Sequence, residues 1–196
     1  NGSVYADLTA QLGDCQHLRR YEHLAIQPYP RQWVSHYPLR NGLDCTVRPV
    51  RPEDAPMMAD FVRSMSKETR YFRFISNLSE LTPRMLANMS HIDYDREMAF
   101  MAVTEIDDQE VLIGTARYSD NFDDKSCEFA VVLGDEYQGM GLASYLMRQL
   151  FLAAAAKDIQ VMKGIVLSEN KHMIQFCRKL GFKVIVATLS SVMVLP

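Results

Sequence analysis

Two glycines between an apolar strand pattern and a long apolar helix pattern constrain the fold of this chain most. Residues 133–143 have the sequence Leu-Gly-Asp-Glu-Tyr-Gln-Gly-Met-Gly-Leu-Ala. Gly139 and Gly141 let the backbone approach a ligand without a Cβ in the way. The helix that follows begins with unpaired N–H groups at the positive end of its dipole, which can bind a pyrophosphate. The segment is not a Walker loop or a dinucleotide fingerprint, because neither a Gly-Lys-Ser/Thr sequence nor GxGxxG is present.

The order of predicted elements indicates an α/β fold with a mixed sheet. Hydrophobic periodicity predicts strands at 46–50, 98–106, 111–118, 127–133 and 161–167, with one or two more in 182–194. It predicts a helix that begins within 51–56 and runs to about 64, and further helices from 66 to 74, 82 to 89, 141 to 157 and 170 to 180. The polar residues 107–110 predict a turn between two strands of a hairpin.

Composition excludes several classes of function. Hydrophobic residues make up 48% and charged residues 23% of 196, which is typical of a globular domain. A net charge of -3 gives no electrostatic reason to expect a nucleic-acid partner, and no apolar run is long enough to span a membrane. The four cysteines are far apart and lack zinc-ligand spacing, so we expect free thiols in a reducing cytoplasm. The His, Asp and Glu residues of segment 91–97 are interpreted as solvated side chains, and we expect no metal.

Two motifs resemble the Gcn5-related N-acetyltransferase (GNAT) family. Residues 138–143 match its Gln/Arg-x-x-Gly-x-Gly/Ala pattern at a strand-to-helix junction. Asn170 begins a second motif, in which an apolar helix face is followed by Leu180-Gly181-Phe182. The resemblance covers about residues 45 to 196 and implies a mostly antiparallel central sheet flanked by helices, with two strands splayed at an acyl-CoA site.

The resemblance also implies which residues hold acetyl-CoA. The backbone N–H groups of residues 138–143, here called the glycine segment, would bind the pyrophosphate. The end of the preceding strand would bind the pantetheine arm, and the second motif would line the other side of this arm. The expected cofactor-binding residues are Val131, Val132, Leu133, Gln138, Gly139, Met140, Gly141, Leu142, Ala143, Asn170, Met173 and Phe176.

Glu128 is the candidate catalytic base. A lysine amine with a pKa of about 10.4 must lose a proton before it attacks a thioester. Strand alternation places Glu128 on one face with Ala130 and Val132, where we expect it to be partly buried. The family often has a glutamate base here, although an ordinary solvated glutamate fits the pattern too. Where many members have an acidic tyrosine this chain has Cys177, which is either a proton donor or simply part of the core.

Further segments resemble the bacterial protein lysine acetyltransferases of the Pat type, among them 23–30, 47–54, 71–74 and 92–99. In those enzymes an acyl-CoA synthetase-like region precedes the GNAT domain. The resemblance therefore implies that residues 1–42 are a linker or tail of an upstream region and that 43–196 are the acetyltransferase domain. It also implies direct attack by a lysine of a metabolic enzyme, acetyl-CoA synthetase above all, without a covalent enzyme intermediate.

Three alternatives remain at this stage, and the oligomeric state is open. A closed acceptor pocket would favour a small-molecule amine as the acceptor, whereas an open groove favours a protein. A non-catalytic acyl-CoA sensor would transfer no acetyl group, so a loss of activity in Glu128→Gln would argue against this alternative. An interaction module would not bind coenzyme A at all.

Overall fold

A single sheet carries all the strands of the described chain. In the computed structural model, which describes residues 28–76, 78–121, 125–186 and 190–195, the strands follow the order β1-β2-β3-β4-β5-β6-β8-β7. The strands are β1 (Ser35–Pro38), β2 (Asp44–Pro49), β3 (Glu97–Ile106), β4 (Gln109–Asp120), β5 (Ser126–Leu133), β6 (Val161–Leu167), β7 (Lys183–Val186) and β8 (Ser190–Leu195). Every neighbouring pair is antiparallel except β5 with β6, which confirms the mixed, mostly antiparallel sheet.

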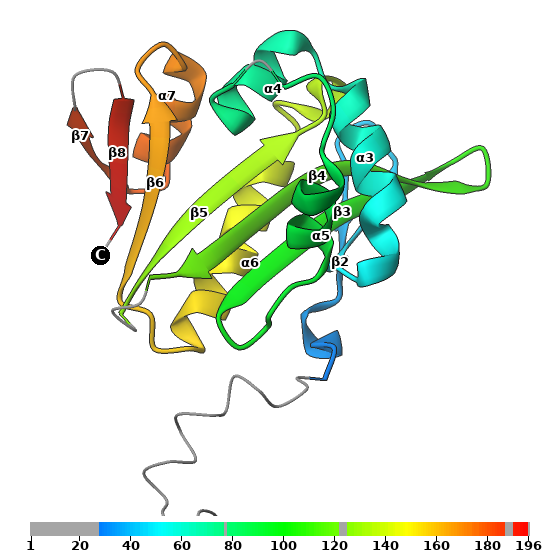
Figure 1. Cartoon of the computed structure of the whole chain (residues 1–196), viewed down its shortest axis with the longest axis horizontal. Coiled ribbons are helices and arrows are strands. Elements are labelled where there is room, and N and C mark those ends of the chain that lie inside the picture. The colour runs from blue at the N-terminus through cyan, green and yellow to red at the C-terminus, as the bar shows by residue number, and fades with distance from the viewer. Residues whose placement is uncertain (1–27, 77, 122–124, 187–189, 196) are drawn as a thin grey trace, which may run out of the picture.

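Helices cover both faces of the sheet (Figure 1). The α-helices are α3 (Ala55–Ser64), α4 (Lys67–Phe74), α5 (Pro83–Ser90), α6 (Leu142–Ala155) and α7 (Lys171–Lys179). Short 3₁₀ turns are η2 (Arg31–Trp33), η3 (Pro52–Asp54) and η4 (Asp135–Tyr137). In the view of Figure 1, α3 and α5 lie in front of the sheet and α6 lies behind it.

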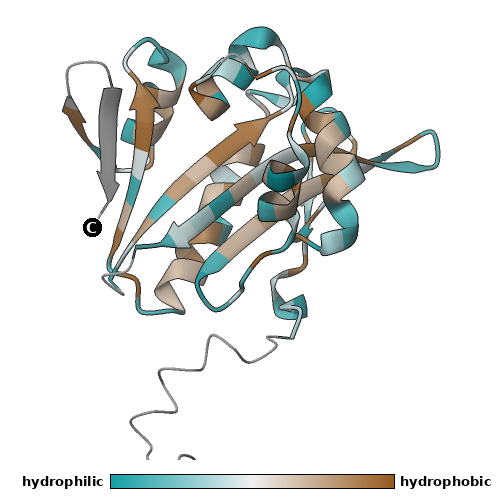
Figure 2. Ribbon diagram, viewed as in Figure 1, coloured by the Kyte–Doolittle hydropathy of each residue, from teal (hydrophilic) through white to brown (hydrophobic). Residues whose placement is uncertain are grey.

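Strand β3 shows how alternation divides the core into two layers. Phe100 and Ala102 belong to the cluster that contains the buried face of α6, whereas Met101 and Val103 belong to the cluster that contains α3. Successive side chains of a strand point to opposite faces, so one apolar strand supplies both layers. Figure 2 shows the corresponding hydrophobic colouring of the central strands. Burial on both faces therefore explains why β3 is a continuous apolar run in the sequence.

The hairpin turn between β3 and β4 is shorter than predicted. Ile106 pairs with Gln109, so only Asp107 and Asp108 remain in the turn, with φ of 51° and 59°. Two positive φ angles match the twist of a two-residue hairpin, and aspartate tolerates this conformation. The ladder therefore takes up residues 109 and 110, which we expected to be in the turn.

Residues 28–42 pack against the domain. Strand β1 pairs with β2, and the Trp33 ring lies 6.1 Å from that of Phe100, edge to face. These contacts cross the boundary that we expect at residue 42. The assignment of residues 1–42 to an upstream region stays a prediction, and its first 27 residues lie outside the described part of the chain.

Candidate acyl-CoA site

A groove of about 620 Å³ lies where β5 and β6 separate. The two strands pair only from Ser126 with Val161 to Glu128 with Lys163, and beyond this point they diverge (Figure 1). The groove is lined by residues of α4, β5, β6, α7 and the glycine segment. The divergence leaves the adjoining edge of β5 without a strand partner from Phe129 onward. Its backbone groups are therefore available to a ligand.

The glycine segment forms one end of the groove. Gly139 and Gly141 have φ of 75° and 89°, which favour glycine, and Gly141 precedes the first residue of α6. No side chain caps this end of α6, so its first N–H groups keep their capacity to bind an anion. The Tyr37 hydroxyl donates to the Met140 carbonyl at 3.4 Å, and this bond holds the segment from the outer side.

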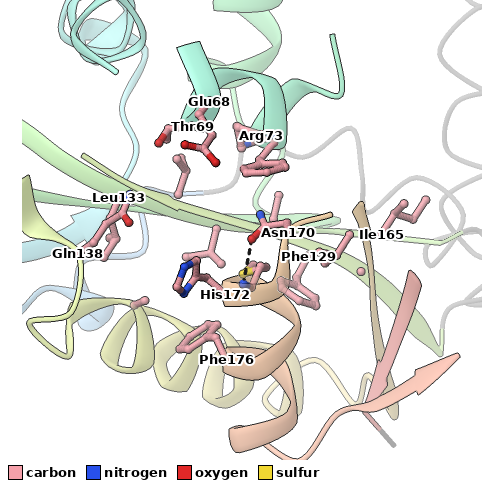
Figure 3. A pocket seen from close by; sticks show the side chains of 18 of the residues that line it. Glu68, Thr69, Arg73, Phe129, Leu133, Gln138, Ile165, Asn170, His172 and Phe176 are labelled. Atoms are coloured by element: carbon pink, nitrogen blue, oxygen red, sulfur yellow. Dashed lines mark hydrogen bonds between the residues drawn. The ribbon is translucent and has the colours of Figure 1, made fainter. Parts of the chain in front are cut away.

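Helix α7 forms a second wall. The Asn170 side chain caps it by accepting a hydrogen bond from the Met173 N–H at 3.0 Å (Figure 3). Met173 and Phe176 line the groove, whereas Ile174 and Cys177 lie on the helix face that is buried in the core. Asn170 thus sets where α7 begins, and thereby which of its side chains face the groove.

Helix α4 forms the third wall. Glu68, Thr69 and Arg73 line the groove from the side opposite α7 (Figure 3). The Asp135 carboxylate joins this wall to the segment after β5, because it accepts hydrogen bonds from the Ser66 N–H at 2.8 Å and the Thr69 hydroxyl at 2.6 Å. Burial alone would raise the pKa of Asp135, but the hydrogen bonds from Thr69 and Ser66 lower it below its ordinary value.

Most of the predicted site residues lie together in this groove. Its lining includes Glu128, Val131, Val132, Leu133, Gln138, Gly139, Ala143, Asn170, Met173 and Phe176. Met140, Gly141 and Leu142 are not among the lining residues, and the Leu142 side chain is fully buried in the core. Their place at the start of α6 leaves only backbone groups to serve a ligand.

The position of Glu128 agrees with strand alternation, but its expected partial burial is wrong. Val132 packs against the cluster that contains α3, whereas Phe129, Val131 and Leu133 belong to the cluster that contains α6, so alternation places Glu128 on the α3 side, and the Glu128 residue itself is exposed. Its neighbour on β4 is Ser119 and its neighbour on β6 is Lys163, the last residue that pairs before the strands diverge. Glu128 therefore lies at the point where β5 and β6 separate, and its side chain is open to solvent.

Cys177 belongs to the core rather than to the groove. It is fully buried and is not among the lining residues. Burial raises the pKa of its thiol to about 11. Its position removes Cys177 as a direct proton donor to a ligand in the groove, and the interpretation as a core residue is the correct one.

Sequence reasoning missed part of the lining. The additional lining residues are Glu68, Thr69, Phe72 and Arg73 of α4, Ile75 just after it, Gly164, Ile165 and Val166 of β6, and Asp135 and His172. The only signal was the aromatic-rich pattern of residues 71–74, which predicts a helix but not its neighbours. Within the described ranges, no group of three or more His, Cys, Asp or Glu is placed to hold a metal ion. No helix there is long and apolar enough to cross a membrane.

Comparison with known proteins shows which family the sequence of this chain matches. An acetyltransferase (GNAT) domain family matches residues 44–183. Acetyltransferase PA5475 of Pseudomonas aeruginosa is 35% identical over 150 residues, which cover 76% of this chain and 80% of that protein. Acetyltransferase Pat of Mycolicibacterium smegmatis is 29% identical over 156 residues, which cover 80% of this chain but 44% of that protein.

Solved structures share the fold. The GNAT domain of S. lividans PAT superposes with a TM-score of 0.78 at 24% identity, over 86% of this chain and 99% of that one. A cAMP-binding acyltransferase from Mycobacterium smegmatis superposes with a TM-score of 0.57 at 22% identity, over 96% of this chain and 56% of that one.

Proposed function

The chain belongs to the GNAT acetyltransferase family, and we propose that it transfers the acetyl group of acetyl-CoA to the side-chain amine of a protein lysine. One observation carries the proposal. A single groove joins the glycine segment at the uncapped start of α6 to the Glu128 carboxylate at the opposite end of the free edge of β5. An anion-binding end and a proton-accepting end on one strand suit a ligand that carries a pyrophosphate at one end and a reactive thioester at the other.

Acetyl-CoA fits the groups that the groove offers. The N–H groups of residues 138–143 would hold the pyrophosphate, because they lie at the positive end of α6 without a capping side chain. The free edge of β5 at residues 131–133 would hydrogen-bond the pantetheine amides in the manner of an added strand. Asn170, Met173 and Phe176 would close the other side of the arm.

Glu128 would act as the base in a direct transfer. A lysine with a pKa of about 10.4 is protonated at neutral pH and becomes a nucleophile only after losing a proton. Glu128 would take that proton, directly or through a water molecule. The neutral amine nitrogen then forms a bond to the thioester carbonyl carbon, the C–S bond breaks, and the thiolate leaves with the bonding electrons. The nitrogen loses one of its two protons as the amide forms, and that proton reaches the thiolate through water.

A protein is the proposed acceptor, and acetyl-CoA synthetase in the cytoplasm is the proposed substrate. The sequence similarity to the acetyltransferase named Pat supports this assignment. The groove also suits a lysine, because the carboxylates of Glu68 and Glu128 line it and both residues are exposed. Such acidic side chains attract a cationic acceptor before its deprotonation.

The test is mass spectrometry of purified acetyl-CoA synthetase after incubation with acetyl-CoA and the wild-type chain or Glu128→Gln. We expect lysine acetylation by the wild type and a loss of about 10²- to 10⁴-fold in rate for the variant, the usual contribution of general base catalysis. Glu105→Gln is the matched control, because Glu105 is exposed near the β3–β4 turn and does not line the groove. Calorimetry with acetyl-CoA shows whether each variant still binds the cosubstrate.

The alternatives predict other outcomes. Transfer to a small amine but not to protein would reassign the acceptor. Tight binding of acetyl-CoA without transfer to any amine would indicate a sensor, and absence of binding would indicate an interaction module. Equal transfer rates for wild type and Glu128→Gln would reject Glu128 as the base.

A further inference from the structure

Arg73 is a half-buried cation without a counter-charge beside the groove. It lies in the last turn of α4 and lines the groove opposite α7 (Figure 3). Its Nε is buried and has no hydrogen-bond partner, and no acidic side chain of the described chain forms an ion pair with it. Its guanidinium carbon lies 5.1 Å from the centre of the Phe74 ring.

Two other arginines differ from Arg73 because their terminal nitrogens have partners within the chain, although the Nε of Arg70 is also buried without one. Arg70, one turn earlier in α4, donates to the carbonyls of Val62, Arg63 and Met65, the last at 2.8 Å. Arg117 is paired with a Glu97 oxygen at 2.5 Å. A cation that is partly withdrawn from water without a counter-charge is destabilised, so an anion supplied from outside the chain would stabilise it.

Arg73 is charged at neutral pH. Burial, followed by the positive charge of Arg117, lowers the pKa of Arg73 to about 10, which still leaves the guanidinium protonated. Arg117 does not relieve this charge but repels it. The partner that this position lacks is therefore an anion.

The register of the sheet places Arg73 near the reacting end of the groove. Arg73 and Arg117 line the same small cavity behind the groove, and Arg117 pairs across the ladder with Ala130 of β5. Ala130 is two residues from Glu128 on the same face of the strand. An anion bound by Arg73 would thus lie on the Glu128 side of the groove, away from the glycine segment that suits the pyrophosphate.

We propose that Arg73 binds a carboxylate of a ligand in the groove. A guanidinium can hold a carboxylate with two parallel hydrogen bonds. The carboxylate has two possible sources: the free end of a dicarboxylic acyl group such as succinyl, carried by coenzyme A, or an acidic side chain next to the acceptor lysine. If the carboxylate comes from the acceptor, the inference rests on the proposed function, because the acceptor must then be a protein lysine. If it comes from a dicarboxylic acyl-CoA, binding can be measured without any acyl transfer.

The first experiment measures binding of succinyl-CoA and acetyl-CoA by calorimetry to the full chain, as wild type, Arg73→Met and Arg73→Lys. Hydrogen bonds to a charged group contribute enough that, if succinyl is the source, Arg73→Met should weaken succinyl-CoA by about tenfold to a hundredfold and leave acetyl-CoA unchanged. Arg73→Lys keeps the charge without the planar fork and should have an intermediate effect. Arg84→Met is the control, because Arg84 is exposed in α5 and does not line the groove.

The second experiment compares lysine peptides with glutamate or glutamine beside the lysine. If the acceptor is the source, kcat/KM should favour the glutamate peptide in the wild type, and this preference should disappear in Arg73→Met. Each readout compares two ligands on the same variant, as a ratio of dissociation constants or of kcat/KM values. A smaller fraction of folded protein changes both members of such a ratio equally and therefore cancels.

The two arms separate failure of the inference from failure of the proposed function. If neither the succinyl-to-acetyl ratio nor the glutamate-to-glutamine ratio changes in Arg73→Met, the inference is overturned. If no peptide is acetylated at all, the proposed function fails, and the calorimetric ratio alone decides the inference.

Discussion

Buried charges in this protein differ in what balances them. Arg48, in β2, donates to both carboxylate oxygens of Asp54 at 2.8 Å, and Asp54 also accepts the Arg51 N–H at 2.7 Å. The hydrogen bond that Arg48 donates to Asp54 holds the pKa of Arg48 above its ordinary value. The Asp54 carboxylate therefore connects β2 to the start of α3, the helix whose chain continues into the α4 wall of the groove.

Replacement of Asp54 should destabilise the domain strongly. Asp54→Ala leaves the buried Arg48 guanidinium with only the longer contact to Glu110 at 3.5 Å, and loss of the close partner costs about 3–5 kcal/mol in the free energy of unfolding. Urea unfolding followed by circular dichroism measures this change. Asp60→Ala is the matched control, because Asp60 pairs with Arg63 on the exposed side of α3 and its loss should cost about 0–1 kcal/mol. Equal effects of the two substitutions would contradict the prediction.

Among the elements, β1 lies against the end of the groove formed by residues 138–143. The Tyr37 ring lies 4.6 Å from that of Tyr145 in α6, and its hydroxyl reaches the Met140 carbonyl. A Cβ at Gly141 would come within 2.7 Å of the Tyr37 oxygen, so the glycine also makes room for this contact. An edge strand thus positions the backbone that is proposed to hold the pyrophosphate.

Loss of the Tyr37 side chain should weaken acetyl-CoA binding without changing the chemistry. We expect Tyr37→Ala to raise the KM for acetyl-CoA by about threefold to tenfold, the magnitude of one hydrogen bond, with kcat unchanged. Steady-state kinetics at varied acetyl-CoA measures both parameters. His36→Ala provides the control on the same strand, because His36 is exposed. A fall in kcat with unchanged KM would show that Tyr37 acts in another way.

At the scale of the whole molecule, the groove divides the sheet. Strands β1 to β5 form a continuous antiparallel ladder, and only three residue pairs join β5 to β6. The Phe129 ring packs against β6 at Gly164, where a Cβ would come within 2.4 Å of the ring. A ligand between β5 and β6 therefore contacts both parts of the sheet, and its binding energy adds to the stability of the whole domain.

Acetyl-CoA should protect the free edge of β5 from hydrogen exchange. Amides of residues 129–133 that face the groove have no strand partner on β6, so they should exchange faster than the β3–β4 ladder and slow down when acetyl-CoA is added. At about 100-fold excess over Kd the whole domain should gain about 2.7 kcal/mol. Hydrogen-exchange mass spectrometry with and without acetyl-CoA tests this expectation. Protection confined to α3 and α5 would place the ligand elsewhere.

Local features of this protein could be predicted from its sequence because their causes are local. The residue type permits the positive φ of Gly139 and Gly141, and the Asn170 cap agrees with its place before an amphipathic helix. The elements from β2 to α7 follow from hydrophobic periodicity to within a few residues. Strand β1 was missed, because four residues that alternate between half-buried and exposed at a sheet edge carry a weak periodic signal.

Only the tertiary structure decided which distant side chains share the groove. Sequence alternation placed Glu128 on the correct face, but its exposure depends on where β6 turns away. Glu68 and Arg73 face the ligand site because α4 packs across β5, a contact between segments some sixty residues apart that no local pattern encodes. The sequence by itself thus determined the family, the order of elements and the glycine-flanked start of α6, since each depends on neighbouring residues. The α4 wall of the groove and the surroundings of Arg73 were decided by long-range packing, which sets the environment of a charge.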